Sequence, residues 1–170
     1  MPSVVLYVRH GQTDYNSRNL WMGSIDSPLN KEGRIQAENL AVELSGIFID
    51  KIYSSPLIRA YETAQFIAEK QKKSPEIVVL PGLRERCFGE LEGTVKDEVA
   101  RRDLALYSGV ESEEDFAGRI EYTMSSIDKD GLVLIVSHSA VFRCLIEKLG
   151  YSSTPPLEKI MNCQIVKLHI

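Results

Sequence analysis

The sequence predicts an α/β fold: a three-layer α/β/α sandwich with a mostly parallel sheet and an antiparallel edge strand. Short apolar runs alternate with helical patterns along the chain, an order typical of parallel strands joined by crossover helices. The runs are apolar at nearly every position, as in strands buried on both faces. With 170 residues, 44% of them hydrophobic, the chain can bury one sizeable core, so we expect a single domain over residues 1–170.

The first half of the chain predicts three strands and two helices in alternation. Apolar runs at residues 4–8, 51–54 and 76–80 predict the strands. The segment 30–46 has apolar residues on one helical face, with Asn30 as a candidate N-cap and Gly46 as a stop. A second amphipathic helix is expected directly after Pro56.

The second half continues the alternation after a loop punctuated by glycines, from Gly82 to Gly93. Two helical stretches follow, and the second begins at Ser112 with Asp115 three residues on as a capping box. Residues 132–136 predict the fourth strand, which leads directly into a helix that ends at Gly150. The alternating run 164–170 predicts the edge strand.

Charge and composition exclude several classes of partner. A net charge of −4 gives no broad basic surface, which argues against nucleic acid, so an anion site would have to be local. No apolar stretch approaches the ~20 residues that span a bilayer, and the start of the chain lacks a signal-peptide pattern, so we expect a cytoplasmic protein without a membrane partner. The cysteines are three and scattered, which supports neither a disulfide framework nor a structural zinc site: Cys87, Cys144 and Cys163.

Polar residues gather where the predicted strands end. Arg9 and His10 end the first strand, Arg59 lies just after the second, and His138 ends the fourth. Parallel sheets bind ligands at the carboxyl ends of their strands. Two cations and two imidazoles are therefore expected at one edge, which folding alone does not require.

These groups suit phosphoryl transfer. Two guanidiniums that face a common point bind phosphate well and a carboxylate less well. His10 could attack phosphorus as a neutral imidazole, and His138, at a helix start, could hold a phosphoryl oxygen as a charged donor. Asn16 and Thr13 could add neutral donors, although a turn residue and a local cap are their alternative roles.

The leaving oxygen needs a proton, and the stretch "LRERCFGELEG" offers Glu85. Glu90 and Glu92 are rivals, but Glu85 lies closest to the carboxyl end of the third strand. The chain has no P-loop, no dinucleotide-binding glycine motif, no cysteine-phosphatase loop, and too few histidines for the usual bimetallic hydrolase. We therefore expect neither a metal nor another cofactor.

The motifs together carry a family resemblance. "LYVRHGQTDYN" resembles the R-H-G signature of the histidine phosphatase superfamily, also called phosphoglycerate mutase-like. "DSPLNKEGRIQA", "IYSSPLIRAYETA", "LRERCFGELEG" and "LIVSHSAVFRCLI" resemble its other segments, so that the resemblance covers nearly the whole chain. It implies a phosphoglycerate mutase-like fold, and it implies residue roles as follows: His10 as the phosphorylated nucleophile, Arg9, Arg59 and His138 as the phosphate pocket, Glu85 as proton donor, and Thr13 and Asn16 as phosphate contacts.

Two departures from the family pattern matter. Ser139 stands where the family usually has glycine after the second histidine, which keeps the backbone N–H for phosphate but crowds the pocket. The chain also lacks the large insertion and the tail that the resemblance associates with the mutase branch. The second departure favours a phosphatase.

We therefore expect a metal-independent phosphomonoesterase, a phosphatase of the histidine acid type, that acts on a small phosphorylated metabolite. The alternatives are a cofactor-dependent phosphomutase of the phosphoglycerate mutase type and a non-catalytic phosphate-binding or interaction domain. Trp21 could line the substrate entrance or simply cover the core. A monophosphate is favoured if the acidic residues that follow Glu85 point into the site: Glu90, Glu92, Asp97 and Glu98. The sequence does not predict the substrate or the oligomeric state.

Overall fold

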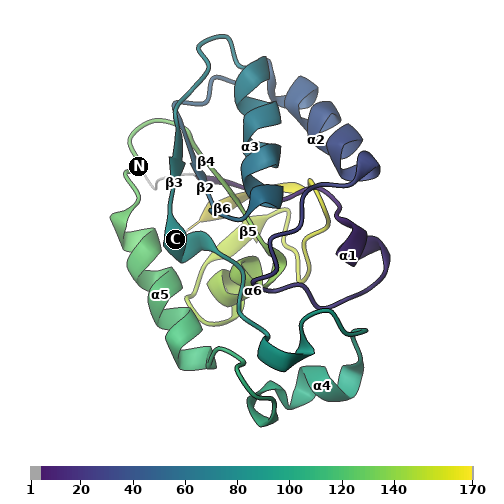
Figure 1. The fold of residues 1–170 in the computed structure, drawn as a ribbon. Helices are drawn as coiled ribbons and strands as arrows, with labels where there is room; N and C mark the ends of the chain where they lie inside the picture. The colour runs from purple at the N-terminus through teal and green to yellow at the C-terminus, as the bar shows by residue number, and fades with distance from the viewer. Residues whose placement is uncertain (1–4, 170) are drawn as a thin grey trace.

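The structure, a computed structural model, describes residues 5–169 and contains one six-stranded sheet in the order β3-β2-β4-β1-β6-β5 (Figure 1). The first four strands are mutually parallel, β6 is antiparallel to β1, and β5 is antiparallel to β6. The predicted α/β class is confirmed. The strands are β1 Val5–Arg9, β2 Lys51–Ser54, β3 Ile77–Val79, β4 Val133–Ser137, β5 Ser152–Thr154 and β6 Ile165–His169. Val4 and Ile170, which were included in two predicted strands, lie outside the described residues.

The prediction of the edge strand is wrong in its position. β6 is antiparallel as expected, but it lies between β1 and β5, and β5 forms the edge. Val166 and Leu168 are buried while Lys167 is exposed, so the alternation reports a strand buried on one face only. The three residues of β5 are all polar, and no apolar pattern announces them.

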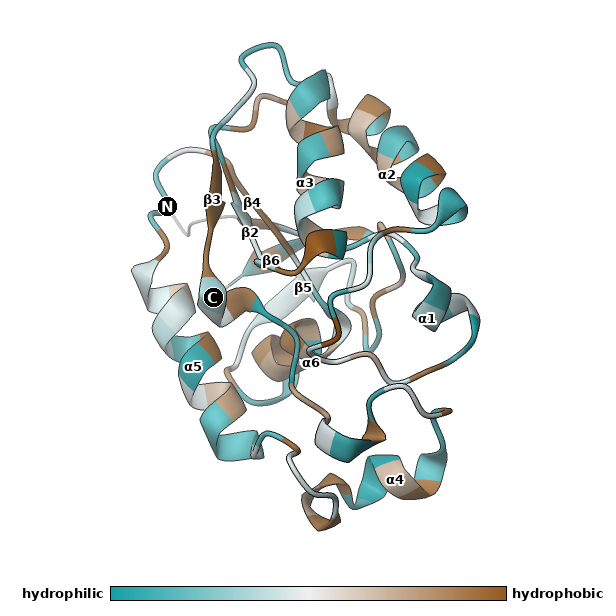
Figure 2. Ribbon diagram, in the orientation of Figure 1, coloured by the Kyte–Doolittle hydropathy of each residue, from teal (hydrophilic) through white to brown (hydrophobic). Residues whose placement is uncertain are grey.

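Helices cover both faces of the sheet (Figure 1). α2 and α3 pack on one face with Leu6 and Val8 of β1, and α5 and α6 pack on the other with Val5 and Tyr7. The helices are α1 Asp14–Ser17, α2 Lys31–Leu44, α3 Ile58–Lys70, α4 Glu98–Arg102, α5 Glu113–Ser126 and α6 Ser139–Glu147, with 3-10 turns at Pro81–Leu83, Gly89–Leu91 and Leu104–Leu106. α6 is hydrophobic along most of its length and α5 is mostly hydrophilic or neutral (Figure 2). Burial of alternate strand residues on opposite faces thus produces the predicted three layers.

The predicted caps are confirmed in part. The Asn30 side chain accepts a hydrogen bond from the Gly33 N–H (2.8 Å), and Ser112 accepts one from the Asp115 N–H (3.0 Å). For the capping box at Ser112, only this first half is found in the described structure. α6 ends at Glu147, before Gly150, and α2 ends at Leu44, before Gly46.

The segment 81–110 lies beyond the arrowhead of β3 in Figure 1, at the carboxyl ends of the parallel strands. It contains short turns and α4, which is the first of the two helical stretches predicted after Gly93 and has five residues. Within residues 5–169, no helix is long and apolar enough to cross a membrane.

Candidate active site

A cleft of about 470 Å³ opens at the carboxyl ends of β1 and β4. Seven predicted site residues line it: Arg9, His10, Asn16, Trp21, Arg59, Glu85 and Ser139. Thr13 and His138 are fully buried and do not line it. Residues distant in the sequence therefore converge at one sheet edge, as the strand order predicts.

His10 is held in one orientation by its neighbours. Its backbone N–H donates to the Ser137 carbonyl of β4, and its Nδ1 lies 2.7 Å from the Gly11 carbonyl oxygen. Since a carbonyl oxygen only accepts, Nδ1 carries the proton and the lone pair is on Nε2. Burial, then the charges of Arg59 and Arg9, hold the pKa of His10 well below its ordinary value. The residue is therefore a neutral imidazole with a free Nε2.

The turn after His10 depends on two glycines. A Cβ on Gly11 would lie 2.6 Å from the Gly33 carbonyl oxygen, and one on Gly33 would lie 2.0 Å from the Gln12 carbonyl oxygen. No side chain fits at this close approach. The backbone at the start of α2 therefore packs directly against the turn that follows His10.

The two predicted arginines are anchored through backbone carbonyls. Arg59, fully buried in the first turn of α3, donates to the carbonyls of Ile25 (2.7 Å) and Gly23 (2.8 Å). Arg9 donates to the Ile160 carbonyl (3.0 Å). Burial lowers the pKa of Arg59 to about 10, so that it is still charged at neutral pH.

His138 lies directly behind His10, with 5.2 Å between the ring centroids. Its Nε2 is 2.7 Å from the Ser55 hydroxyl, and its backbone is fixed by Tyr7, whose hydroxyl donates to the His138 carbonyl. Burial, then the charges of Arg59 and His10, hold the pKa of His138 well below its ordinary value. In the ligand-free protein His138 is thus neutral, not the charged donor that the sequence analysis expected.

Unpartnered polar atoms concentrate at this edge. In the described part of the chain, four buried side-chain nitrogen or oxygen atoms lack a hydrogen-bond partner: Arg9 Nε, Arg59 Nε, His138 Nδ1 and Trp21 Nε1. Three of the four belong to the predicted phosphate pocket. An unpaired buried donor costs free energy, and an oxyanion offers the acceptors that these groups need.

Thr13 and Asn16 are tied to each other. Thr13 caps α1 by accepting from the Asn16 N–H (3.2 Å), and Asn16 Oδ1 accepts from the Thr13 N–H (3.1 Å). The buried Thr13 hydroxyl also donates to Met22 Sδ, so its contacts are those of a local cap. Asn16 reaches the cleft wall.

Trp21 and Ser139 both line the cleft. Trp21 is 4% exposed and packs on Phe88 with 4.6 Å between ring centroids. It therefore both covers the core and lines the cleft, so the two roles weighed for it are combined. Ser139 begins α6 and is half-buried at the cleft surface.

Of the three carboxylates weighed as proton donors, Glu85 is the one that lines the cleft. Its carboxylate accepts from the backbone N–H groups of Arg86 (2.9 Å) and of Ala140 in the first turn of α6 (3.3 Å). Glu92 accepts from Ser24 and from the Phe88 N–H, and Glu90 accepts from the Ser108 N–H. The rivals therefore serve to fix loop backbone.

Glu90, Glu92, Asp97 and Glu98 do not line the cleft, so they do not favour a monophosphate as substrate. Asp97 caps α4 through the Ala100 N–H, and Glu98 pairs with Arg101 at the surface. Cations line the cleft instead, with two acids among them: Lys96, Arg101, Arg143 and Lys159, with Glu147 and Glu158.

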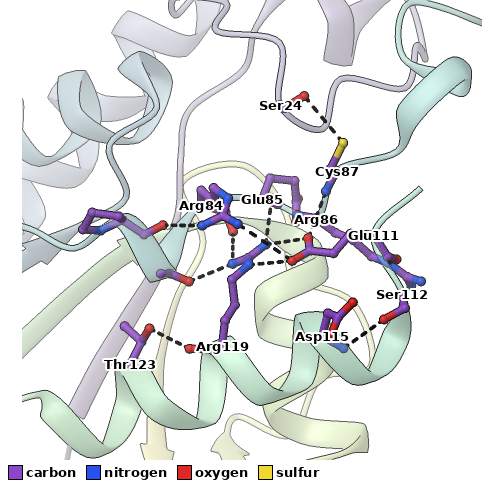
Figure 3. A network of polar contacts seen from close by, with 12 residues as sticks. Ser24, Arg84, Glu85, Arg86, Cys87, Glu111, Ser112, Asp115, Arg119 and Thr123 are labelled. Atoms are coloured by element: carbon purple, nitrogen blue, oxygen red, sulfur yellow. Dashed lines mark hydrogen bonds and ion pairs between the residues drawn. The ribbon is translucent and has the colours of Figure 1, made fainter. Parts of the chain in front are cut away.

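Arg119 of α5 is the centre of a network of hydrogen bonds that fixes the loop of Glu85 (Figure 3). Arg119 Nη1 donates to the carbonyls of Gly82 (2.8 Å) and Arg84 (2.9 Å), and its Nη2 donates to the Glu85 carbonyl (3.1 Å). Arg119 also pairs with Glu111 through Nε (2.7 Å) and Nη2 (2.8 Å).

Two further residues support the site and were not predicted from the sequence: Arg119 and Asn162. The Asn162 amide donates to the His10 carbonyl (2.9 Å) and to Asn16 Oδ1 (3.3 Å), from the loop between β5 and β6. One signal was present for Arg119: it shares the helical face of Phe116, Ile120 and Thr123, which are buried. A charge on an apolar face implies a buried partner.

Between Val5 and His169, no three His, Cys, Asp or Glu side chains are placed to hold a metal ion. The positive charge of the cleft comes from its arginines and lysines.

Comparison with known proteins shows which family the chain resembles. The model of the histidine phosphatase superfamily (branch 1) matches residues 5–170. The chain is 31% identical to the metal-independent phosphoserine phosphatase of Arabidopsis thaliana, over 98% of this chain and 76% of the relative. It is 32% identical to the 2,3-bisphosphoglycerate-dependent phosphoglycerate mutase of Bartonella henselae, over 88% and 82%. A mycobacterial glucosyl-3-phosphoglycerate phosphatase, solved with VO3, matches with a TM-score of 0.77 at 26% identity, covering 97% of this chain and 92% of that chain.

Proposed function

The chain belongs to branch 1 of the histidine phosphatase superfamily, and from this premise we propose that it is a phosphomonoesterase that works through a phosphohistidine on His10. The substrate of this proposal is a small phosphorylated metabolite, and the reaction needs no cofactor. The assignment of the residues to individual roles is part of the proposal.

One observation carries the proposal most directly. Three of the four buried nitrogens without partners in the described structure belong to residues that we assign, with His10, to the phosphate pocket: Arg9, Arg59 and His138. A phosphoryl group seated between them would supply three oxygens as acceptors. The arginines would then face the charge that spreads over those oxygens in the transition state, where preorganised donors contribute most.

In the first step, His10 Nε2 attacks phosphorus and the bond from phosphorus to the ester oxygen breaks. Glu85 gives its proton to that oxygen, so the product leaves as a neutral alcohol. In the second step, Glu85 takes a proton from water as the water oxygen attacks the phosphohistidine. Inorganic phosphate leaves, and His10 and Glu85 return to their starting states.

The proposal is tested by phosphate release from p-nitrophenyl phosphate in excess chelator. We expect turnover to survive, because the arginines supply the positive charge that a metal ion supplies in other phosphatases. Vanadate and tungstate should inhibit as oxyanions that fit the same donors. Activity that is abolished by chelator and restored by a divalent ion would sink the mechanism.

A mutase is the second candidate, favoured by the likeness to a 2,3-bisphosphoglycerate-dependent phosphoglycerate mutase. Both activities share the phosphohistidine and differ in its acceptor. The phosphoenzyme of a phosphatase decays in buffer at the turnover rate, whereas that of a mutase persists until a second phosphorylatable alcohol is added. A non-catalytic binding domain would bind tungstate and form no phosphoenzyme at all.

A further inference from the structure

Arg119 places its whole guanidinium on the loop that carries Glu85. The group has five N–H donors, and five hydrogen bonds are recorded for it: three to the carbonyls of Gly82, Arg84 and Glu85, and two to Glu111. Its side chain is only 15% exposed. Such a group gives a far more rigid attachment than a surface ion pair does.

Glu111 completes the attachment on the other side of Glu85. Its Oε2 accepts from the Cys87 N–H (3.2 Å), and its own backbone carbonyl accepts from Arg86 Nε (3.0 Å). Burial raises the pKa of the Glu111 carboxyl, but the Arg119 hydrogen bonds and charge outweigh this, and the pKa lies below its ordinary value. The loop is thus held on both flanks of Glu85, by carbonyls before it and an amide after it (Figure 3).

The Glu85 side chain leaves the backbone on the opposite side, toward the cleft and the start of α6. No contact of its carboxylate with Arg119 is recorded in the described structure. The position of the carboxylate therefore depends on the backbone that Arg119 and Glu111 fix.

We propose that Arg119 and Glu111 are positioning residues for proton transfer by Glu85, an inference that rests on the proposed function. They touch neither the phosphoryl group nor the leaving oxygen. Displacing an acid by about 1 Å can cost about 10²-fold in rate. Loosening this attachment should therefore act only on the step that needs the proton.

The test uses two substrates with different demands for that proton. p-Nitrophenolate leaves readily without it, whereas an alkoxide does not. Phosphoenzyme formation is measured in single turnovers with p-nitrophenyl phosphate and with propyl phosphate. Arg119→Lys keeps the charge and loses the five-donor fork, and it should slow the propyl reaction about 10- to 100-fold more than the nitrophenyl reaction. Glu111→Gln should act in the same direction.

Glu113→Gln is the matched control. Glu113 lies on α5, the helix of Arg119, and forms an exposed ion pair with Lys148 at the end of α6 (3.1 Å). The variant breaks this ion pair, and no hydrogen bond from the Glu113 side chain to the loop of Glu85 is found in the described structure. It should leave the ratio of the two rates unchanged. Thermal unfolding of each variant separates loss of folding from loss of positioning.

A double-mutant cycle gives the decisive outcome. The proton is already absent in a Glu85→Gln variant. Adding Arg119→Lys to that variant should therefore not change the ratio of the nitrophenyl rate to the propyl rate any further. An additional loss there, or equal losses on both substrates in the single variant, would overturn the inference and assign Arg119 to folding alone. Absence of any phosphoenzyme in the unmodified protein would instead overturn the proposed function. If Arg119→Lys does not fold, Glu111→Gln takes its place in the cycle.

Discussion

The two halves of the cleft are built in different ways. Arg9, His10 and His138 sit at the ends of paired strands, where β1 and β4 are in register from Val5 and Val133 onward. Glu85 sits on a loop between two 3-10 turns, and that loop is held by side chains of Glu111 and Arg119. The backbone ladder of the sheet fixes the first half, the phosphate half, and a side-chain network fixes the second, the acid half.

This difference separates the chemical tasks. In the proposed function, the phosphate half binds a group that is the same in every phosphomonoester, and a rigid sheet edge suits it. In the same proposal, the acid half contacts the part of the substrate that varies, the alcohol. Damage to the phosphate half should therefore affect all esters alike, whereas damage to the acid half should depend on the leaving group.

The largest expected effect is at Arg59, which comes from the first turn of α3 and completes the phosphate half. Arg59→Ala removes a buried charge from the transferring group and should slow phosphoenzyme formation about 10³- to 10⁵-fold, equally for nitrophenyl and alkyl esters. Arg59→Lys should recover little, because the fork that donates to Ile25 and Gly23 is lost. Rapid-quench kinetics measures both. A loss confined to substrate affinity would show that Arg59 only binds.

The next effect separates the halves. Glu85→Gln keeps the shape of the side chain and removes the proton, so it should slow alkyl ester cleavage about 10²- to 10⁴-fold more than p-nitrophenyl ester cleavage. Single-turnover rates are needed because slow dephosphorylation would mask the difference. Glu90→Gln is the control, since Glu90 accepts from the Ser108 N–H away from the cleft. Equal losses on both esters would make Glu85 structural.

The smallest expected effect is on the free energy of unfolding, and it comes from His10 and His138 in the phosphate half. Burial holds the pKa values of His10 and His138 well below their ordinary values. Below pH ~6.5 the unfolded chain therefore binds protons that the folded protein does not, and stability should fall by up to about 1.4 kcal/mol per pH unit for each histidine. Urea unfolding between pH 7.5 and 5.5 measures this loss.

His138→Gln should reduce that pH dependence by about half. An unfolding free energy that stays constant down to pH 5.5 would contradict the burial of two neutral imidazoles.

The comparison also explains what the sequence could predict. Arg9, His10 and His138 follow apolar runs directly, so strand order alone brings them to one edge. The short distance of Glu85 from the third strand predicts its place at the same edge, and the loop brings it to the cleft. Arg119 supports Glu85 by donating to its backbone carbonyl, 34 positions away in the sequence. Every residue has such a carbonyl, so the residue types do not reveal this contact. The edge strand β5 was not predicted for the same reason, because its three polar residues pair with β6 through backbone groups.

The charge state of His138 was also beyond reach of the sequence. A helix start favours an anion nearby, which suggested an imidazolium, but full burial beside Arg59 disfavours the cation. The sequence predicts that two imidazoles and two guanidiniums meet at one sheet edge, but only the structure shows that His10, Arg59 and His138 are fully or almost fully buried there.

The most direct test of the account is the identity of the phosphorylated residue. The protein is mixed with radiolabelled p-nitrophenyl phosphate, quenched without acid within milliseconds, and mapped by peptide. The account predicts label on His10 that is stable in alkali and lost in acid, and predicts its absence in His10→Ala, which should still bind tungstate. Label on a serine or cysteine, or acid-stable label, would contradict the central claim that His10 carries the phosphoryl group.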